Sequence, residues 1–187
     1  MSFRSGPRHA QHQYPSRPNV GATGPTGPAG PGPTGPTGPI GPAGATGAGN
    51  YASFFDLVSD AEPVVNPGAA VGFPNDGPAS AGTTITRLSP STFNLALPGA
   101  YEVTWQASIT EPGQLQVALN GVGVPETVSG RDTGTLQIVG DTTVRTTLPN
   151  TVLSIINPAG NSAALHETAT AGGANPVSVT LTIKQVA

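Results

Sequence analysis

The sequence contains no cysteine and few charged residues, and both deficits exclude classes of protein. Without cysteine there is no disulfide framework, no thiolate metal site and no cysteine nucleophile. Seven basic and ten acidic residues give a formal net charge of −3, which lacks the electrostatic footprint of a nucleic-acid-binding protein. No apolar run approaches the roughly 18 residues of a membrane span. No apolar core follows the N-terminal arginines, so a secretory signal peptide is not predicted.

Glycine and proline are abundant instead, with 26 and 21 residues. Their average shares are only about 7% and 5%, so part of the chain is expected to be fibrous or of low complexity. The composition changes near residues 20 and 50 and divides the chain into three segments. Residues 1–20 hold Arg4, Arg8 and Arg17 and almost nothing to bury, so we expect a disordered, basic anchoring arm.

Residues 21–49 have a glycine period of three. Glycine stands at 21, 24, 27, 30, 32, 35, 38, 41, 44, 47 and 49, and the residues between are proline, alanine, threonine and one isoleucine. A collagen triple helix requires this period because only glycine fits at its crowded axis, whereas a flexible linker requires no period. The segment predicts a collagen-like stalk of about 90 Å, with a soft spot where the period slips at Gly30-Pro31-Gly32.

Threonine occupies the outward Y position of several triplets. Its hydroxyl is available for O-linked sugar, although threonine is also simply a soluble residue at this position. The candidate glycosylation sites are Thr23, Thr26, Thr34, Thr37 and Thr46.

Residues 50–187 show the period of two that is typical of β-strands. The clearest stretch is 101–110, where every second side chain is apolar, followed by a turn and a strand over 115–119. Asn120-Gly121 then favours a tight hairpin. The predicted β-core residues are Tyr101, Val103, Trp105, Ile109, Leu115, Val117, Leu119, Val179, Leu181 and Ile183.

Further strands are predicted over 54–58, 69–73, 83–88, 92–97, 135–139, 142–148, 152–156 and 177–186. About ten short strands between turns, with helix nearly absent, predict an all-β sandwich or jelly roll. The low surface charge and the stalk, which needs three copies, both favour a homotrimer.

Candidate catalytic and metal-binding residues are sparse. His166 is the one histidine after residue 50, and a lone histidine beside glutamate is typical of a surface or turn residue. The acids Asp132 and Asp141, and the group Asp56, Asp60 and Glu62, have no calcium-loop spacing and read as solvated carboxylates. We therefore predict no enzyme activity, no cofactor and no metal. The segment 129–134 (SGRDTG) is an exposed loop and a candidate contact site.

Four motifs after the stalk carry a resemblance to a known family. They are 83–93 (TTITRLSPSTF), 98–103 (PGAYEV), 119–122 (LNGV) and the ending 180–187 (TLTIKQVA). Joined to a Gly-Pro-Thr stalk, they make residues 21–187 resemble the BclA-like collagen-like glycoproteins of bacterial spore surfaces.

The resemblance implies a tumour-necrosis-factor-like jelly roll that trimerises, nucleates the triple helix and forms the tip of a hair-like filament on the exosporium. It also implies glycosylated stalk threonines, synthesis in the mother cell and attachment through the N-terminus to the basal layer. Residues 1–20 lack the apolar, proline-rich leader of that family, so another spore layer or an appendage is an alternative anchoring partner.

The sequence therefore predicts a structural filament protein of the spore surface whose tip can meet host or environmental surfaces. The alternative is a binding module, either a phage fibre tip or a lectin-like adhesin, that uses the same trimeric β-domain.

Overall fold

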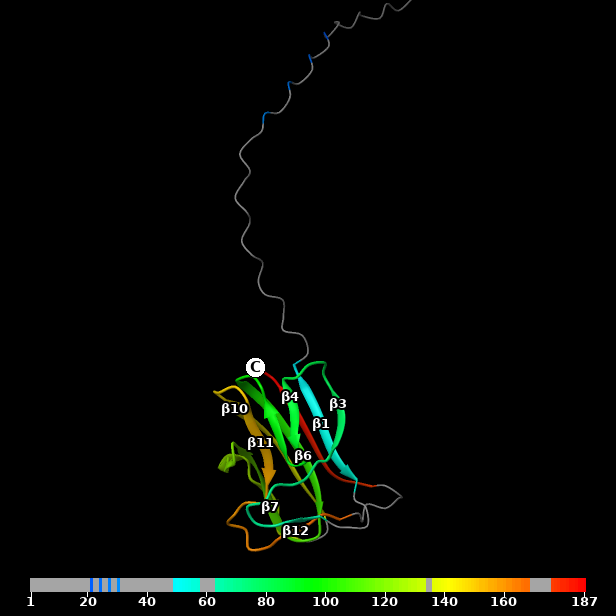
Figure 1. The fold of residues 1–187 in the computed structure, drawn as a ribbon, viewed down its shortest axis with the longest axis vertical. Coiled ribbons are helices and arrows are strands. Elements are labelled where there is room, and N and C mark those ends of the chain that lie inside the picture. The colour runs from blue at the N-terminus through cyan, green and yellow to red at the C-terminus, as the bar shows by residue number, and fades with distance from the viewer. Residues whose placement is uncertain are drawn as a thin grey trace, which may run out of the picture. The chain divides into compact units, whose positions relative to one another are not determined.

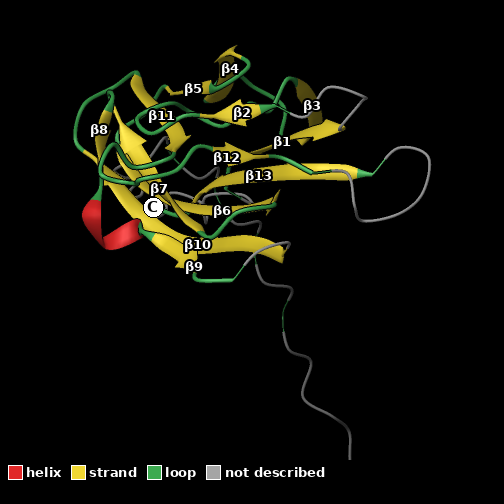
Figure 2. Cartoon of the chain, turned by 90° about the horizontal axis from the view of Figure 1, so that it is seen from below, coloured by secondary structure: helices red, strands yellow, loops and turns green. Residues whose placement is uncertain are grey.

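Two antiparallel sheets stack as two layers around a shared apolar core (Figures 1 and 2). The computed structural model describes residues 49–57, 63–133, 136–168 and 176–187, together with Gly21, Gly24, Gly27 and Gly30. Contacts divide the chain into the units Met1–Pro42 and Ala43–Ala187. The described strands all belong to the second unit, and we call residues 50–187 the head.

The first sheet has five strands in the order β10-β6-β13-β1-β3. Their bounds are β1 (Tyr51–Leu57), β3 (Asn75–Ala79), β6 (Gly99–Ile109), β10 (Leu136–Thr146) and β13 (Val177–Gln185). The strands β6 and β13 lie in the middle and are those with the clearest apolar alternation, because both neighbours of each are strands and one face is the core.

The second sheet has six strands in the order β4-β5-β11-β7-β8, with β9 paired to β7. Their bounds are β4 (Ile85–Ser89), β5 (Thr92–Leu95), β7 (Gly113–Leu119), β8 (Val122–Gly123), β9 (Ser129–Arg131) and β11 (Thr151–Ile156). A separate pair joins β2 (Val64–Val65) to β12 (Leu165–His166), and the 3-10 turn η1 (Pro125–Thr127) is the helical element of the described residues.

The chain passes repeatedly from one sheet to the other. After β1 and β3 in the first sheet come β4 and β5 in the second, then β6, β7 to β9, β10, β11 and β13 in alternation. This winding between two antiparallel sheets is a jelly roll. The all-β jelly-roll fold predicted from the sequence is confirmed.

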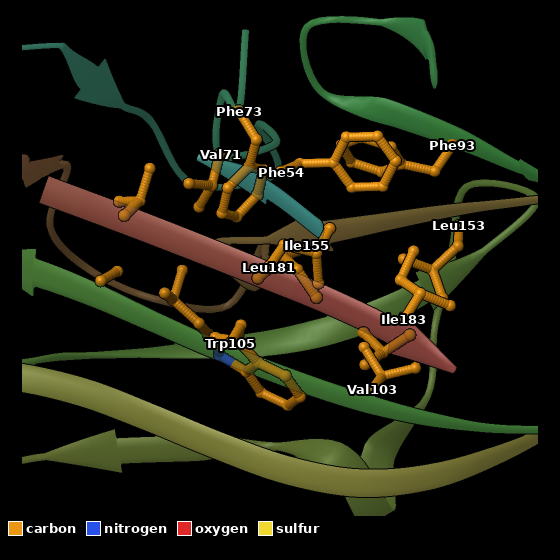
Figure 3. Close-up of a cluster of buried hydrophobic side chains, with 14 of the residues drawn as sticks. Phe54, Val71, Phe73, Phe93, Val103, Trp105, Leu153, Ile155, Leu181 and Ile183 are labelled. Atoms are coloured by element: carbon orange, nitrogen blue, oxygen red, sulfur yellow. The ribbon is translucent and has the colours of Figure 1, made fainter. Parts of the chain in front are cut away.

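The core fills the space between the sheets with side chains from alternate strand positions (Figure 3). Phe54 of β1 lies 4.3 Å from Phe93 of β5, measured between ring centroids, and so links the two layers. Nine of the ten predicted core residues are buried, and Leu119 is partly buried against the cluster. The residues Asn120 and Gly121 have φ values of 51° and 80°, as a tight hairpin turn between β7 and β8 requires.

Three predictions about strands are wrong. The two strands predicted over 135–139 and 142–148 are one continuous strand, β10, because Gly140 pairs with Trp105 in the sheet instead of turning the chain. Residues 69–73 make only an isolated bridge at Ala70, although Val71 and Phe73 are buried as the alternation indicated. The first part of the loop predicted at 129–134 is the strand β9, which pairs with β7.

Candidate functional site

The outward face of the first sheet is a regular surface of the head, and the strand register defines its members. Trp105, Leu181 and Phe54 point into the core, so the residues that alternate with them point outward. We call this set the assembly face. It consists of Val139, Asp141 and Thr143 on β10, Glu102, Thr104 and Gln106 on β6, Thr180, Thr182 and Lys184 on β13, and Tyr51, Ser53 and Phe55 on β1.

Hydroxyl groups dominate the chemistry of the assembly face. Ser53 and Thr182 share a hydrogen bond of 2.7 Å between their oxygens, across β1 and β13. Lys184 Nζ lies 3.8 Å from Glu102 Oε2, so two of the few charges on the face neutralise each other. Val139 is 58% exposed near the middle of β10. The face is thus short of net charge and supplied with groups that can hydrogen-bond a neighbour.

A second group of polar residues lies at one end of the head. We call it the distal end, and it is the end at which β6 finishes, at Ile109, and at which β12 lies. Tyr51 pairs with Lys184 at the opposite end, next to the C-terminus (Figure 1). Two connections, one holding Glu111 and one holding His166 and Glu167, meet at the distal end.

Glu111 fastens β12 to the turn between β6 and β7. Its Oε2 accepts the backbone N–H of His166 at 2.8 Å, and its Oε1 lies 2.5 Å from the ring Nδ1 of the same residue. Burial raises the pKa of Glu111, but these hydrogen bonds outweigh it and hold the pKa below the usual range. His166 is half-exposed in the short strand β12. Its contact with Glu111 has a structural role, because it holds this strand in place. The sequence suggested a surface residue and missed Glu111 as the partner.

Glu167 is completely buried, and only one of its two carboxyl oxygens has a hydrogen-bond partner. Ser178 Oγ donates to Oε2 at 3.3 Å, while Oε1 has no hydrogen-bond partner. Desolvation, and then the charge of Asp56, raise the pKa of Glu167 to about 7. Burial also raises the pKa of Asp56 itself. Sequence reasoning missed this cluster, because no local pattern distinguishes Glu167 from a solvated glutamate.

The remaining predicted acids do not form a site. Asp132 follows β9 and is exposed, whereas Asp141 lies on β10 with its Oδ1 3.5 Å from Thr104 Oγ1. Asp60 and Glu62 lie outside the described residues. Within the part of the chain that the structure describes, no group of three or more histidine and acidic side chains is arranged to hold a metal ion.

The candidate glycosylation sites Thr23, Thr26, Thr34, Thr37 and Thr46, and the whole arm 1–20, lie outside the described residues. Four glycines of the stalk segment, Gly21, Gly24, Gly27 and Gly30, are described and exposed, with no atom within 4 Å of the position of an added Cβ. Over the described residues, no helix has the length and apolarity needed to cross a bilayer.

Comparisons with known proteins bear on the fold. No protein-family model and no curated protein matches the sequence. The globular domain of zebrafish complement 1qA protein superposes with a TM-score of 0.52 at 12% identity, over 74% of this chain and 98% of that domain. Rabbit GITRL, a second solved structure, gives a TM-score of 0.41 at 9% identity, over 74% of this chain and 94% of its own. The head therefore has a jelly-roll fold of the C1q globular type.

Proposed function

We propose that this protein is a structural component of the bacterial spore surface, in which three chains join through a collagen-like stalk and a trimeric head. The observation that carries the proposal is the glycine period of 21–49, which runs directly into a jelly roll with a hydroxyl-rich sheet face. Residues 1–20 would attach the filament to a basal-layer or appendage protein of the spore.

Chain connectivity supports the assembly face as the contact between heads. Only Asn50 separates the last stalk glycine, Gly49, from the first residue of β1. The three chains of a triple helix run side by side around one axis. Because β1 follows the stalk directly, the sheet that contains β1 is the one we propose as the contact between heads.

The chemistry of the assembly face fits a permanent contact. Half of its side chains are serine, threonine or glutamine, and with Lys184 and Glu102 paired, Asp141 is the one charge of the face left to desolvate. The exposed apolar residue Val139 supplies area that gains from burial. Such a face can be covered by two other copies without a large electrostatic penalty.

The first test is the oligomeric state of the full chain in analytical ultracentrifugation. We expect a mass near three times 18.5 kDa. The substitution Val139→Lys places a charge in the assembly face and should shift the population toward monomer. Val122→Lys is the matched control, because Val122 is also an exposed strand valine, at 71%, but lies on β8 of the other sheet. A monomeric wild-type chain would contradict the proposed assembly.

The second test concerns location. Immunogold labelling with an antibody against the head should decorate spores and leave vegetative cells unlabelled. The spore assignment rests on the resemblance of residues 21–187 to the spore-surface glycoproteins. Labelling of vegetative cells at equal density would contradict it while leaving the trimer intact.

The alternative function is a receptor- or glycan-binding adhesin, or a phage fibre tip, built on the same trimer. A hollow at the distal end of the head, lined by polar residues, supports this alternative function. A glycan array probed with the full chain separates the two functions, because a purely structural head should give no selective signal.

A further inference from the structure

A hollow of about 450 Å³ opens at the distal end of the head. Three segments line it: the turn into β7 (Pro112, Gly113 and Gln114), the end of β9 (Arg131 and Asp132) and the loop before β12 (Asn161, Ser162 and Ala163). Its volume lies within the range of about 300 to 1,000 Å³ that is usual for small-molecule sites. The hollow includes Arg131 and Asp132 of the 129–134 segment, which the sequence marked as a candidate contact site.

The walls of the hollow are held by side-chain hydrogen bonds of Asn157 and Asn161. Asn161 Nδ2 donates to Gln114 O at 3.1 Å and to Asn157 Oδ1 at 2.6 Å. Asn157 is fully buried, and its Nδ2 in turn donates to Val65 O at 2.9 Å and Ala163 O at 3.1 Å. The opposite wall is fixed because Gly113 pairs with Arg131 between β7 and β9. The backbone walls are therefore preformed, which lowers the entropic cost of binding, and the Arg131 side chain is the part that reorients.

Arg131 provides a positive charge with unused donors. Its Nη2 donates to Ile109 O, but Nε and Nη1 are enclosed and have no partner. No carboxylate of the described residues forms an ion pair with it. Both oxygens of the nearby Glu111 are occupied by His166. Burial lowers the pKa of Arg131, and the charge of Glu111 only partly offsets this. One carboxylate takes two parallel hydrogen bonds from an edge of the guanidinium that includes Nη2, either with Nε or with Nη1.

The rim of the hollow presents hydroxyl-binding groups. Gln114, Asp132 and Ser162 are exposed there and offer amide, carboxylate and hydroxyl groups. Among the described residues, no aromatic side chain lines the hollow, and Pro112 and Ala163 make its apolar lining. A ligand with many hydroxyls and one carboxylate matches these groups better than an apolar peptide side chain does.

We propose that the distal hollow binds a sugar acid, such as a uronic acid at the end of a glycan, with Arg131 taking the carboxylate and Asp132, Gln114 and Ser162 taking ring hydroxyls. Because Nε and Nη1 are enclosed in the free chain, binding includes a turn of the guanidinium toward the hollow, in which Nη2 leaves Ile109 O and an edge of two nitrogens faces the carboxylate. The site goes beyond the structural function proposed above and does not depend on the oligomeric state.

The test is calorimetric titration of the full-length protein with glucuronic acid, with glucose as a probe that has similar hydroxyls and no carboxylate. We expect a dissociation constant on the order of 1 mM for glucuronic acid and affinity at least about tenfold lower for glucose. Equal affinity for the two sugars, or no heat of binding from glucuronic acid at concentrations of about 50 mM, overturns the proposal.

Three variants locate the site. Arg131→Gln removes the charge and should weaken glucuronic acid binding at least about tenfold. Ser162→Phe fills the hollow from an exposed loop, retains Arg131 and should weaken binding as strongly even where Arg131→Gln disturbs folding. Arg145→Gln, on β10 and outside the hollow, is the matched control and should stay within about twofold of wild type. Unchanged affinity in Ser162→Phe, or a loss in Arg145→Gln equal to that in Arg131→Gln, contradicts the assigned site.

Discussion

At the scale of single residues, Gly140 is required by its neighbour Trp105. The two residues are paired across β10 and β6, and the indole lies where a side chain at 140 would project. An added Cβ would overlap three ring atoms, Cζ2, Cε2 and Cη2. A glycine inside a strand often marks such a close approach. The dipeptide Gly140-Asp141 looks like a turn in the sequence, and only the cross-strand partner explains why it is not one.

Gly140→Ala should therefore destabilise the head by about 1 to 3 kcal/mol through overpacking. Urea unfolding followed by the fluorescence of Trp105, the single tryptophan, measures the change. Gly160→Ala is the matched control, because nothing lies within 4 Å of its added Cβ. It should stay within about 0.5 kcal/mol of wild type. Equal effects of the two substitutions would contradict the role given to the indole.

Glu167 should make the stability of the head depend on pH. Its pKa is raised to about 7 in the folded chain from an ordinary value of 4.5, so folding favours the neutral form. The stabilisation is complete below pH 4.5 and is lost as the pH rises through 7. About 3 kcal/mol should disappear between pH 4 and pH 8. Asp56, whose pKa is also raised, acts in the same direction.

Glu167→Gln keeps an acceptor for Ser178 and cannot ionise, so it should match wild type near pH 4 and exceed it in stability at pH 8. Chemical denaturation at a series of pH values provides the measurement. Asp56→Asn removes the neighbouring charge and should reduce the slope without abolishing it. Parallel pH profiles for wild type and Glu167→Gln would show that the carboxyl is not responsible.

At the scale of elements, the sequence predicts the central strands well and the edges poorly. The strands β6 and β13 carry long apolar alternation because each has one face in the core and a strand on both sides. The edge strand β3 (NDGPA) was missed, because its residues are those of a turn and Pro78 is tolerated where a ladder bond is not needed. The assembly face follows from the same alternation, whereas Glu111, Asn157 and Glu167 gain their roles from partners distant in sequence.

Asn157 is the clearest case of a residue that joins elements. Its side chain connects the end of β11 to β2 and to the loop before β12 through three hydrogen bonds in a fully buried position. Asn157→Ala should cost about 2 to 4 kcal/mol, because it leaves several buried groups unsatisfied. Asn94→Ala, which removes one long bond of 3.4 Å to Asn150, should cost less than about 1 kcal/mol. Thermal unfolding of both variants provides the comparison, and a similar loss in both would contradict it.

At the scale of the whole molecule, the stalk and the head are expected to depend on each other. The segment 21–49 has few complete triplets and a slip at Gly30-Pro31-Gly32, so it should not hold three chains together alone. A peptide of residues 1–49 should be monomeric at room temperature and lack the circular dichroism of a triple helix. The full chain should show that signal. A trimeric, triple-helical peptide would disprove the role of the head as the nucleus of assembly.

The pairing of β1 with β13 has a practical consequence for engineering. Because these strands run antiparallel, Asn50 and Gln185 are hydrogen-bonded neighbours, and the carboxyl terminus emerges beside the first residue of the head. Cargo fused after Ala187 would crowd the junction through which the chain enters its first strand. Gly160 lies in an open turn beyond the end of β11, and a peptide inserted there would instead project from the distal end of the head. An antigen or enzyme meant for display is therefore better inserted in that turn.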